Sequence, residues 1–590
     1  MMRPLDHFRH SGQRLFARPS LLIWAVIMGC LGAGATMLFY ESMYLIQYLL
    51  SGRSGMVNDV TSTFSTLQTI VFPCIGGLVA GLLLNLSNRF KTDAESDYME
   101  AVALGNGQLS IPQGLARILS ALSVVATGGS IGREGPMIHF AAMTASAFGR
   151  FFYVDAVHLR LLVACGAAAG VAAAYNTPIA GALFVAEIVI GSMSMVVLGP
   201  LLVAAATSHL LMRFSGRYHL LYEMYDVWHY STEFMLWAVV LGLLAGCATP
   251  LFLRYLSFLR QTFKKIPLAL PWRMALGGLC MGGFLLLDQR VAGNGDFIVH
   301  QLLHNAWAWQ SLLLFLLVKV LATGVVVGSG AVGGVLTPVM CVGASVALLM
   351  VHAAALIFPE INNFMPEFAL LGMGAFLAAA TSAPLMAMIM IIEMSQNLSL
   401  AAPLIFSCTI AYAVARFFKG LVMYHVTETR EQSDLLRSRL RHLHIEDFIQ
   451  TPQNVINANA SVKEAVQKFT QLSVRYIYVV DDENVYQGVI AHKDVTELLF
   501  NSGDMQQLIK DSLISRRYLQ PLTIGMTLDQ IQEHLVNFSG ERLPVLDQQE
   551  PAHLIGVIYK SEVLAKYSEI KRSLDNTDKV VLDLHAPNSK

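Results

Sequence analysis

Two stretches of the chain share one pattern: GAAAGVAAAYNTPIAGALFVAEI at residues 166–188 and GMGAFLAAATSAPLMAMIMIIEM at residues 372–394. A glycine, a proline and a glutamate recur between them at a constant offset of 206 residues. A second pair lies upstream, where GSIGREGP at 129–136 is echoed, at an offset of 202, by VGGVLTP ending at Pro338. Two glycine-rich breaks, each followed by a similar helix pair, predict a duplicated transporter architecture.

Charge is unevenly spread along the chain. Of the 590 residues, 55% are hydrophobic and 14% are charged, against roughly a quarter charged in an average soluble protein. Residues 1–430 hold 42 of the charged side chains and residues 431–590 hold 39. This distribution predicts a membrane domain in residues 1–430 and a soluble domain in residues 431–590. A net charge of -1 gives no polyanion-binding signature, so we expect no nucleic-acid partner.

The segment Gly132-Arg133-Glu134-Gly135-Pro136 places charge inside apolar sequence. Its glycines and proline end one helix and begin another, and a helix N-terminus attracts anions through unpaired N–H groups and the macrodipole. Glu134 puts a carboxylate where an anion would otherwise sit. Ionised, it would block the site; protonated, it would lose its charge and swing away. A structural ion pair of Glu134 with Arg133 or Arg117 fits the composition equally well.

In their order and spacing, GREGP, AYNTPIAGALFVAEI, SGAVGGVLTP and SAPLMAMIMIIEMS resemble the CLC chloride channel and transporter family over roughly residues 20–430. With DYMEA at 97–101, they look closest to a bacterial branch of ClcB-type proteins. The tail, in which an α+β pattern of about 65 residues occurs twice, resembles a pair of CBS domains. The resemblance implies an all-α polytopic membrane protein with duplicated, inverted-topology halves and broken helices, plus a C-terminal α+β CBS-domain pair.

The same resemblance implies a homodimer in the lipid bilayer that moves chloride and is not an enzyme. We expect no required cofactor, no catalytic residue and no metal ligand. Positive residues before the first apolar segment place the N-terminus in the cytoplasm, and with it the C-terminus, of a protein of the inner (plasma) membrane. The expected boundaries are a cytoplasmic segment at 1–19, the transport domain at 20–430, a linker at 431–449, CBS domains at 450–502 and 508–568, and a tail at 569–590.

The family's anion pathway is carried over position by position. In CLC proteins the GREGP glutamate is the external gate, which points to Glu134. The family's central serine lies in a GSGIP motif that this chain lacks; Ser96 occupies its place, and Ser110 in Ser110-Ile111-Pro112 is the alternative. The GxFxP loop becomes 334–338, with leucine in place of phenylalanine. The other anion-binding positions that the resemblance implies are Gly132, Arg133, Gly135, Val335, Leu336 and, as the intracellular tyrosine, Tyr424.

Ile188 is the most informative departure from the family. Proton-coupled members carry two consecutive glutamates here, the second being an internal proton-transfer site, whereas this chain has Glu187 followed by Ile188. Isoleucine cannot bind a proton, which favours passive or weakly proton-coupled chloride conduction. A strict proton/chloride antiporter that uses another internal proton route is the alternative. From a different class, a CBS-regulated divalent-cation carrier would need clustered carboxylates.

In CBS pairs that bind adenine nucleotides, an acidic residue contacts the ribose and follows a serine or threonine by three positions. Asp494 and Glu562 occupy the acidic positions, but Ala491 and Tyr559 stand three residues before them. The sequence therefore favours a structural or dimer-organising CBS pair over one that senses an adenine nucleotide.

Overall fold

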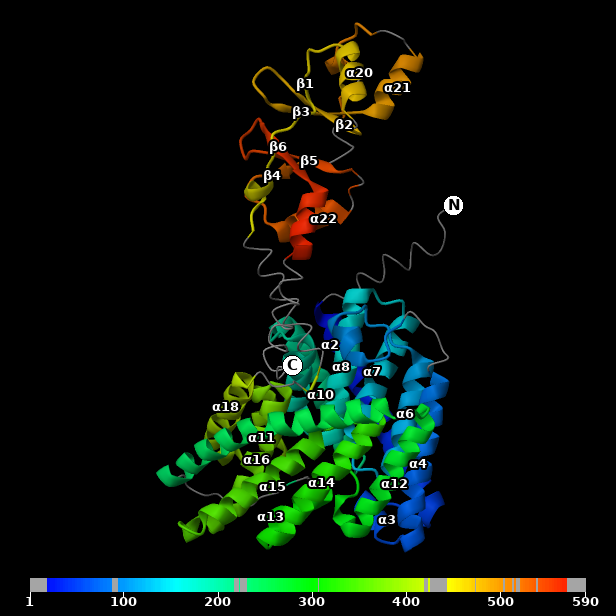
Figure 1. Ribbon diagram of the computed structural model, residues 1–590, viewed down its shortest axis with the longest axis vertical. Coiled ribbons are helices and arrows are strands. Elements are labelled where there is room, and N and C mark those ends of the chain that lie inside the picture. Colours follow the sequence, from blue (N-terminus) through cyan, green and yellow to red (C-terminus); the bar gives the residue numbers. More distant parts are fainter. Residues whose placement is uncertain are drawn as a thin grey trace, which may run out of the picture. The chain divides into compact units, whose positions relative to one another are not determined.

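Figure 1 shows the computed structural model of the chain, which separates into two compact units, Met1–Glu428 and Thr429–Lys590. The structure describes residues 18–87, 94–216, 222, 231–305, 307–418, 423–424, 443–472, 474–501, 505–511, 514–515, 520–536, 538 and 540–569.

The first unit is helical. Its first half comprises α2 (Arg18–Ser51), α3 (Val57–Thr61), α4 (Thr66–Ser87), α5 (Tyr98–Ala103), α6 (Ile111–Ala126), α7 (Glu134–Phe151), α8 (Ala156–Tyr175), α9 (Pro178–Phe184), the π-helix η1 (Val185–Ile190) and α10 (Met195–Phe214). Its second half comprises α11 (Thr232–Lys265), α12 (Leu270–Leu287), η2 (Gln289–Val291), α13 (Asp296–His304), α14 (Trp309–Ser329), α15 (Leu336–Ala354), η3 (Pro359–Phe364), α16 (Met365–Thr381), α17 (Pro384–Ser395), η4 (Leu398–Leu400) and α18 (Ala401–Phe417).

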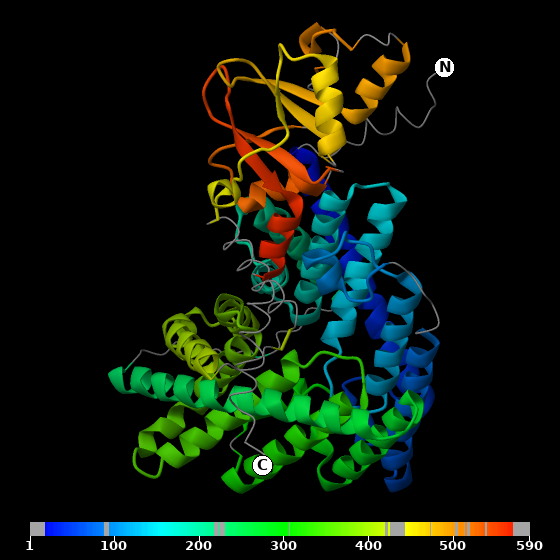
Figure 2. The ribbon, with the colours of Figure 1, turned by 45° about the horizontal axis from the view of Figure 1, so that its top comes forward.

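Within the described residues, ten helices are long and apolar enough to cross a membrane. Several others are too short for a crossing, among them α5, α9 and α13, and the protein has the broken helices that the sequence predicted. The two halves contact each other where α12 packs along α4, and within the second half the long α11 runs across α14 and α16 (Figures 1 and 2).

Small residues let these helices approach closely. A side chain at Gly170 of α8 would place its Cβ 2.9 Å from the Cα of Ile138 in α7, and Gly372 of α16 meets the backbone of Gly343 in α15. Bulky residues at either point would push the helices apart. The small-residue runs of the repeat therefore form the contact between α8 and α7 in the first half and between α16 and α15 in the second half.

The repeat extends to backbone conformation. Asn176 and Ser382, which are 206 residues apart, both adopt left-handed φ values, 58° and 56°, at the ends of α8 and α16. The next helix of each half then begins at a proline, Pro178 or Pro384, a residue suited to the first helical turn.

The second unit contains two sheets of the same design. It comprises η5 (Ile445–Phe448), β1 (Val455–Asn457), α20 (Val462–Gln471), β2 (Tyr476–Val480), β3 (Tyr486–Ala491), α21 (His492–Asn501), η6 (Ile509–Asp511), β4 (Leu522–Thr523), α22 (Leu528–Val536), β5 (Arg542–Leu546) and β6 (Leu554–Tyr559). The sheet orders are β1-β2-β3 and β4-β5-β6, each with a parallel pair followed by an antiparallel pair. The α+β repeat read from the sequence is present.

Candidate anion site

The two glycine-rich breaks meet in the middle of the first unit. Gly132 and Gly334 form an antiparallel bridge in which the N–H of each donates to the carbonyl of the other, at 2.7 and 2.9 Å. A Cβ on Gly132 would lie 2.7 Å from the Gly334 oxygen, so the contact requires residues without side chains. As a result, α7 and α15 begin next to each other, and the unpaired N–H groups of their first turns lie in one region.

A cavity of about 360 Å³ lies against these two helix starts. From the first half it is lined by residues of α5, α6 and α7, including Arg117 and His139. From the second half it is lined by residues of α11 and α14, including Arg260, and by residues 331–336. The predicted positions that line it are Gly135, Val335, Leu336 and Tyr424. Two helix N-termini, together with Arg117, Arg260 and a single carboxylate at Asp97, suit weak anion binding.

The two candidate serines lie outside the cavity lining. Ser96 is half-buried, and its hydroxyl accepts a hydrogen bond from Arg117 at 3.3 Å. Ser110 is buried as the N-cap of α6, and its hydroxyl has no hydrogen-bond partner among the described residues. Asp97, next to Ser96, lines the cavity and lies 3.7 Å from Arg117. The choice between the two serines stays a prediction.

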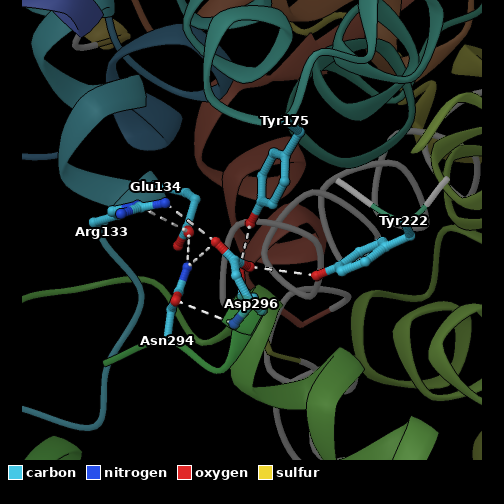
Figure 3. A network of polar contacts seen from close by, with 7 residues as sticks. Arg133, Glu134, Tyr175, Tyr222, Asn294 and Asp296 are labelled. Carbon is cyan, nitrogen blue, oxygen red and sulfur yellow. Dashed lines mark hydrogen bonds and ion pairs between the residues drawn. The ribbon is translucent and has the colours of Figure 1, made fainter. Parts of the chain in front are cut away.

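Glu134 is the first residue of α7 and is 2% exposed. Its Oε1 accepts a hydrogen bond from the Asn294 side chain and lies 4.0 Å from the Nε of Arg133, while its Oε2 has no partner among the described residues (Figure 3). Arg117 is paired with Asp97 instead of Glu134. Of the two ion pairs that the sequence left open, only a loose one with Arg133 is present.

Arg133 makes its closer ion pair with Asp296, at 3.2 Å, and its guanidinium lies 5.2 Å from the ring centre of Tyr40. Its side chain is therefore engaged within the protein, while the N–H of Gly132 is used in the pair with Gly334. An anion-binding role for either residue stays a prediction.

Three residues near Glu134 were not predicted from the sequence: Asn294, Asp296 and Lys319. Asn294 and Asp296 lie in the GNGD segment before α13, and Lys319 is completely buried in α14. The available signal was a single lysine inside an otherwise apolar stretch, because an ionisable residue at membrane depth is a functional candidate by default.

Glu187 and Glu393 make reciprocal contacts. Glu187 accepts backbone hydrogen bonds from Leu385 and Met386 at the start of α17, at 3.4 and 2.8 Å. Glu393 accepts them from Ile179 and Ala180 at the start of α9, at 2.9 and 2.8 Å. Each carboxylate thus caps the helix of the other half, the exchange of partners that a two-fold axis produces. Glu187 therefore makes the contacts of a helix-capping carboxylate at the start of α17.

Ile188 follows Glu187 inside the π-helix η1 and is buried. The left-handed residue that ends the helix comes four positions after Glu187, at Gly191, but three positions after Glu393, at Gln396. The wider turn of a π-helix accommodates one extra residue. The position where the family's exchangers carry their second glutamate is therefore the point at which the two halves differ by one residue.

In the second unit, a cavity of about 460 Å³ lies between the two sheets and is lined in part by Arg475, Arg542 and Lys560. Neither Asp494 nor Glu562 lines it, and Glu562 accepts a hydrogen bond from Gln450 at 2.9 Å. The Tyr478 hydroxyl donates to the carbonyl of Arg542 at 2.8 Å, and burial raises the pKa of that tyrosine.

Comparison with known proteins assigns the class. A family model described as voltage gated chloride channel matches residues 76–416, and a CBS domain model matches residues 445–501. The chain belongs to the CLC voltage-gated chloride channel family: it is a multi-pass membrane protein, a chloride channel or transporter and not an enzyme, with a CBS region at its C-terminal end.

The chain is similar to ClcB-type proteins over most of their length. It is 41% identical over 423 residues to a putative chloride channel protein ClcB-like of Ralstonia nicotianae, covering 71% of this chain and 98% of that one. It is 36% identical over 412 residues to the voltage-gated ClC-type chloride channel ClcB of Salmonella typhi, covering 68% and 97%.

Solved structures share the fold. A slow cyanobacterial Cl-/H+ antiporter superposes with a TM-score of 0.62 at 24% identity, covering 71% of this chain and 98% of its own. A eukaryotic CLC transporter superposes with a TM-score of 0.59 at 14% identity, covering 92% and 97%. The predicted fold class is confirmed.

Proposed function

We propose that the protein conducts chloride through the cavity between the α7 and α15 N-termini, with Glu134 as a protonatable gate and with little or no proton coupling. The observation that carries this proposal is the charge balance around Glu134. Four ionisable side chains gather there, two acidic (Glu134 and Asp296) and two basic (Arg133 and Lys319). Their formal charge is zero with Glu134 ionised and +1 with Glu134 protonated, so protonation both frees the site and favours an anion in it.

The absence of a carboxylate at position 188 supports passive conduction. Ile188 is 1% exposed and apolar, so it offers no proton acceptor on the inner side of Glu134. A strict proton/chloride antiporter would need another internal route for protons. His139, which lines the cavity, is a candidate for that alternative, because its Nε2 has no hydrogen-bond partner among the described residues.

The decisive experiment measures chloride and proton flux together from proteoliposomes that contain the purified protein. Chloride release without proton movement is the expected result. Uphill proton movement driven by chloride would make the protein an exchanger despite Ile188. Glu134→Gln should conduct at all pH values, and a pH dependence that persists in Glu134→Gln would exclude Glu134 as the gate.

Ser96 is proposed as the central hydroxyl. Its replacement by alanine or proline should change the preference between chloride and nitrate, with Ser110→Ala as the matched control. If only the Ser110 variant changes the preference, the assignment moves to Ser110.

The remaining parts of the proposal concern assembly. We propose a homodimer with both termini in the cytoplasm and with two CBS domains, at 450–502 and 508–568, that organise the dimer without binding adenine nucleotide through Asp494 or Glu562. The positions of these two side chains outside the cavity support this. Millimolar ATP should leave the melting temperature of the full chain unchanged, and a clear stabilisation would refute it.

A further inference from the structure

The segment between η2 and α13 reaches across to Glu134 from the second half of the first unit. The Asn294 side chain donates one hydrogen bond to Glu134 Oε1 and another, of 2.7 Å, to Asp296 Oδ2 (Figure 3). Asn294 is 9% exposed, so water competes little for these bonds. A single amide group therefore ties the carboxylate of Glu134 to a second carboxylate.

Asp296 is held from three sides. Its Oδ2 accepts from Asn294 and, at 3.2 Å, from Arg133 Nη2, while its Oδ1 accepts from the Tyr222 hydroxyl at 3.4 Å. Arg133 is closer to Asp296 than to Glu134, where the separation is 4.0 Å. Arg133 is therefore paired mainly with Asp296, and it stabilises an ionised Glu134 less than it would without Asp296.

Lys319 fixes the segment that carries Asn294 and Asp296. Its Nζ donates to the carbonyl oxygens of Val291 and Gly293, at 3.0 and 2.8 Å. Gly293 and Gly295 adopt φ values of 66° and 107°, which glycine reaches without strain. This geometry holds Asn294 and Asp296 against Glu134.

We propose that Asn294 and Asp296 are positioning residues that form a latch on Glu134 and set the proton concentration at which the gate opens; this inference rests on the proposed gating role. The Asn294 amide donates to a carboxylate and so favours the ionised, closed gate. Asp296 opposes it, through its negative charge and its hold on Arg133. The titratable and charged groups around Glu134 are Tyr40 of α2, Arg133 before α7, Tyr175 of α8, Tyr222, Asp296 of α13 and Lys319 of α14.

The test compares two substitutions whose expected effects have opposite signs. Asn294→Leu removes the donor to the carboxylate, so half-maximal chloride efflux should move to higher pH by about one unit. Asp296→Asn removes the negative charge and releases Arg133 towards Glu134, so it should move to lower pH by about one unit. Efflux is measured from proteoliposomes over a range of pH, with Asn294→Ala as a second variant if the leucine does not assemble.

Asp288→Asn is the matched control, because Asp288 is a buried carboxylate of the same region that pairs with Arg290 at 2.8 Å. It should leave the pH of half-maximal efflux unchanged. Shifts of Asn294→Leu and Asp296→Asn in the same direction would overturn the latch, because loss of structure alone does not reverse sign between the two.

The Glu134→Gln background separates the latch from the gate. In that background, Asn294→Leu should leave the pH-independent efflux unchanged within about twofold, because the formal charge of the cluster does not change. Asp296→Asn makes that charge more positive, so it should raise the efflux equally at every pH. A larger effect of Asn294→Leu, or a pH dependence in either double variant, would mean that Asn294 and Asp296 act elsewhere and that the latch is wrong while the gate stands. If Glu134→Gln alone kept the pH dependence of the natural chain, the gate would fail and the latch with it.

Discussion

The two halves of the membrane unit share a pair of helix-capping glutamates but differ in the charges at their glycine-rich breaks. Glu187 and Glu393, which are 206 residues apart, cap each other's neighbouring helices. Glu134, by contrast, corresponds at the offset of 202 to Leu336. Carboxylates that both halves retain are part of the fold, whereas the carboxylate that only one half carries faces the other half without a counterpart. Glu134, the proposed gate, therefore lies where the internal symmetry is broken.

The surroundings of the two glycine breaks differ in the same way. At the offset of 202, Lys319 corresponds to Arg117, so each half places a cation on the helix before its break. Arg117 is partly exposed, pairs with Asp97 and lines the cavity, whereas Lys319 is completely buried and holds the segment with Asn294 and Asp296. One cation thus faces the cavity, and the other holds the segment that contacts Glu134.

Lys319→Met should have the largest effect, because it removes one of the two cations of the cluster around Glu134. The cluster would then reach a formal charge of zero, not +1, with Glu134 protonated. We expect the maximal chloride efflux to fall about tenfold, equivalent to ~1.4 kcal/mol, and half-maximal efflux to move to higher pH. Lys265→Met, at the exposed end of α11, is the control. Unchanged efflux in Lys319→Met would reduce Lys319 to a space-filling role.

Glu187→Leu and Glu393→Leu test the shared side of the comparison. Each removes two charge-assisted hydrogen bonds to backbone N–H groups that are partly exposed, so each should cost about 2 kcal/mol of stability. Because the contacts are reciprocal, the two losses should match, and the pH dependence of chloride efflux should stay unchanged. Thermal unfolding of the detergent-solubilised protein measures this, with the glutamine variants as milder controls. A changed pH response in Glu187→Leu alone would show that Glu187 does more than cap α17.

Much of this arrangement could be predicted from the sequence, because it depends on local rules. Small-residue runs, prolines at helix starts and the constant offset predicted the duplicated helix pairs, and the charge distribution separated the membrane unit from the soluble one. Gly135, Val335, Leu336 and Tyr424, which the resemblance implied as anion-binding positions, line one cavity, and their binding role stays a prediction.

The partners of Glu134 could not be predicted in this way. Asn294 lies 160 residues from it along the chain, and no periodicity links the two. Their contact depends on a glycine-rich turn and on a buried lysine that binds two carbonyl groups. Apolar sequence is also no guide to burial within the protein, because Cys30 and Cys247 are exposed on membrane-length helices. A membrane helix can present apolar residues outwards as well as inwards.

The smallest expected effect concerns the soluble unit, where the two repeats differ by the imidazole of His553. In both repeats an aspartate after the second strand accepts a backbone N–H at 2.8 Å, Asp481 from Val485 and Asp547 from His553. The second oxygen of Asp547 also contacts His553 Nδ1, at 2.9 Å, whereas that of Asp481 accepts from Gln487. The backbone N–H and the side chain of His553 hold the pKa of Asp547 below its usual value.

A carboxyl whose pKa is lowered in the folded state adds stability above its unfolded pKa, and that stability is lost as the pH falls through the folded pKa. The β5–β6 hairpin should therefore lose hydrogen-exchange protection as the pH falls below about 4, and Asp547→Asn should remove this pH dependence. His553→Val copies Val485 of the first repeat and keeps the backbone bond, so it should retain part of the dependence. Equal pH profiles in Asp547→Asn and in the natural chain would show that this aspartate does not couple the hairpin to pH.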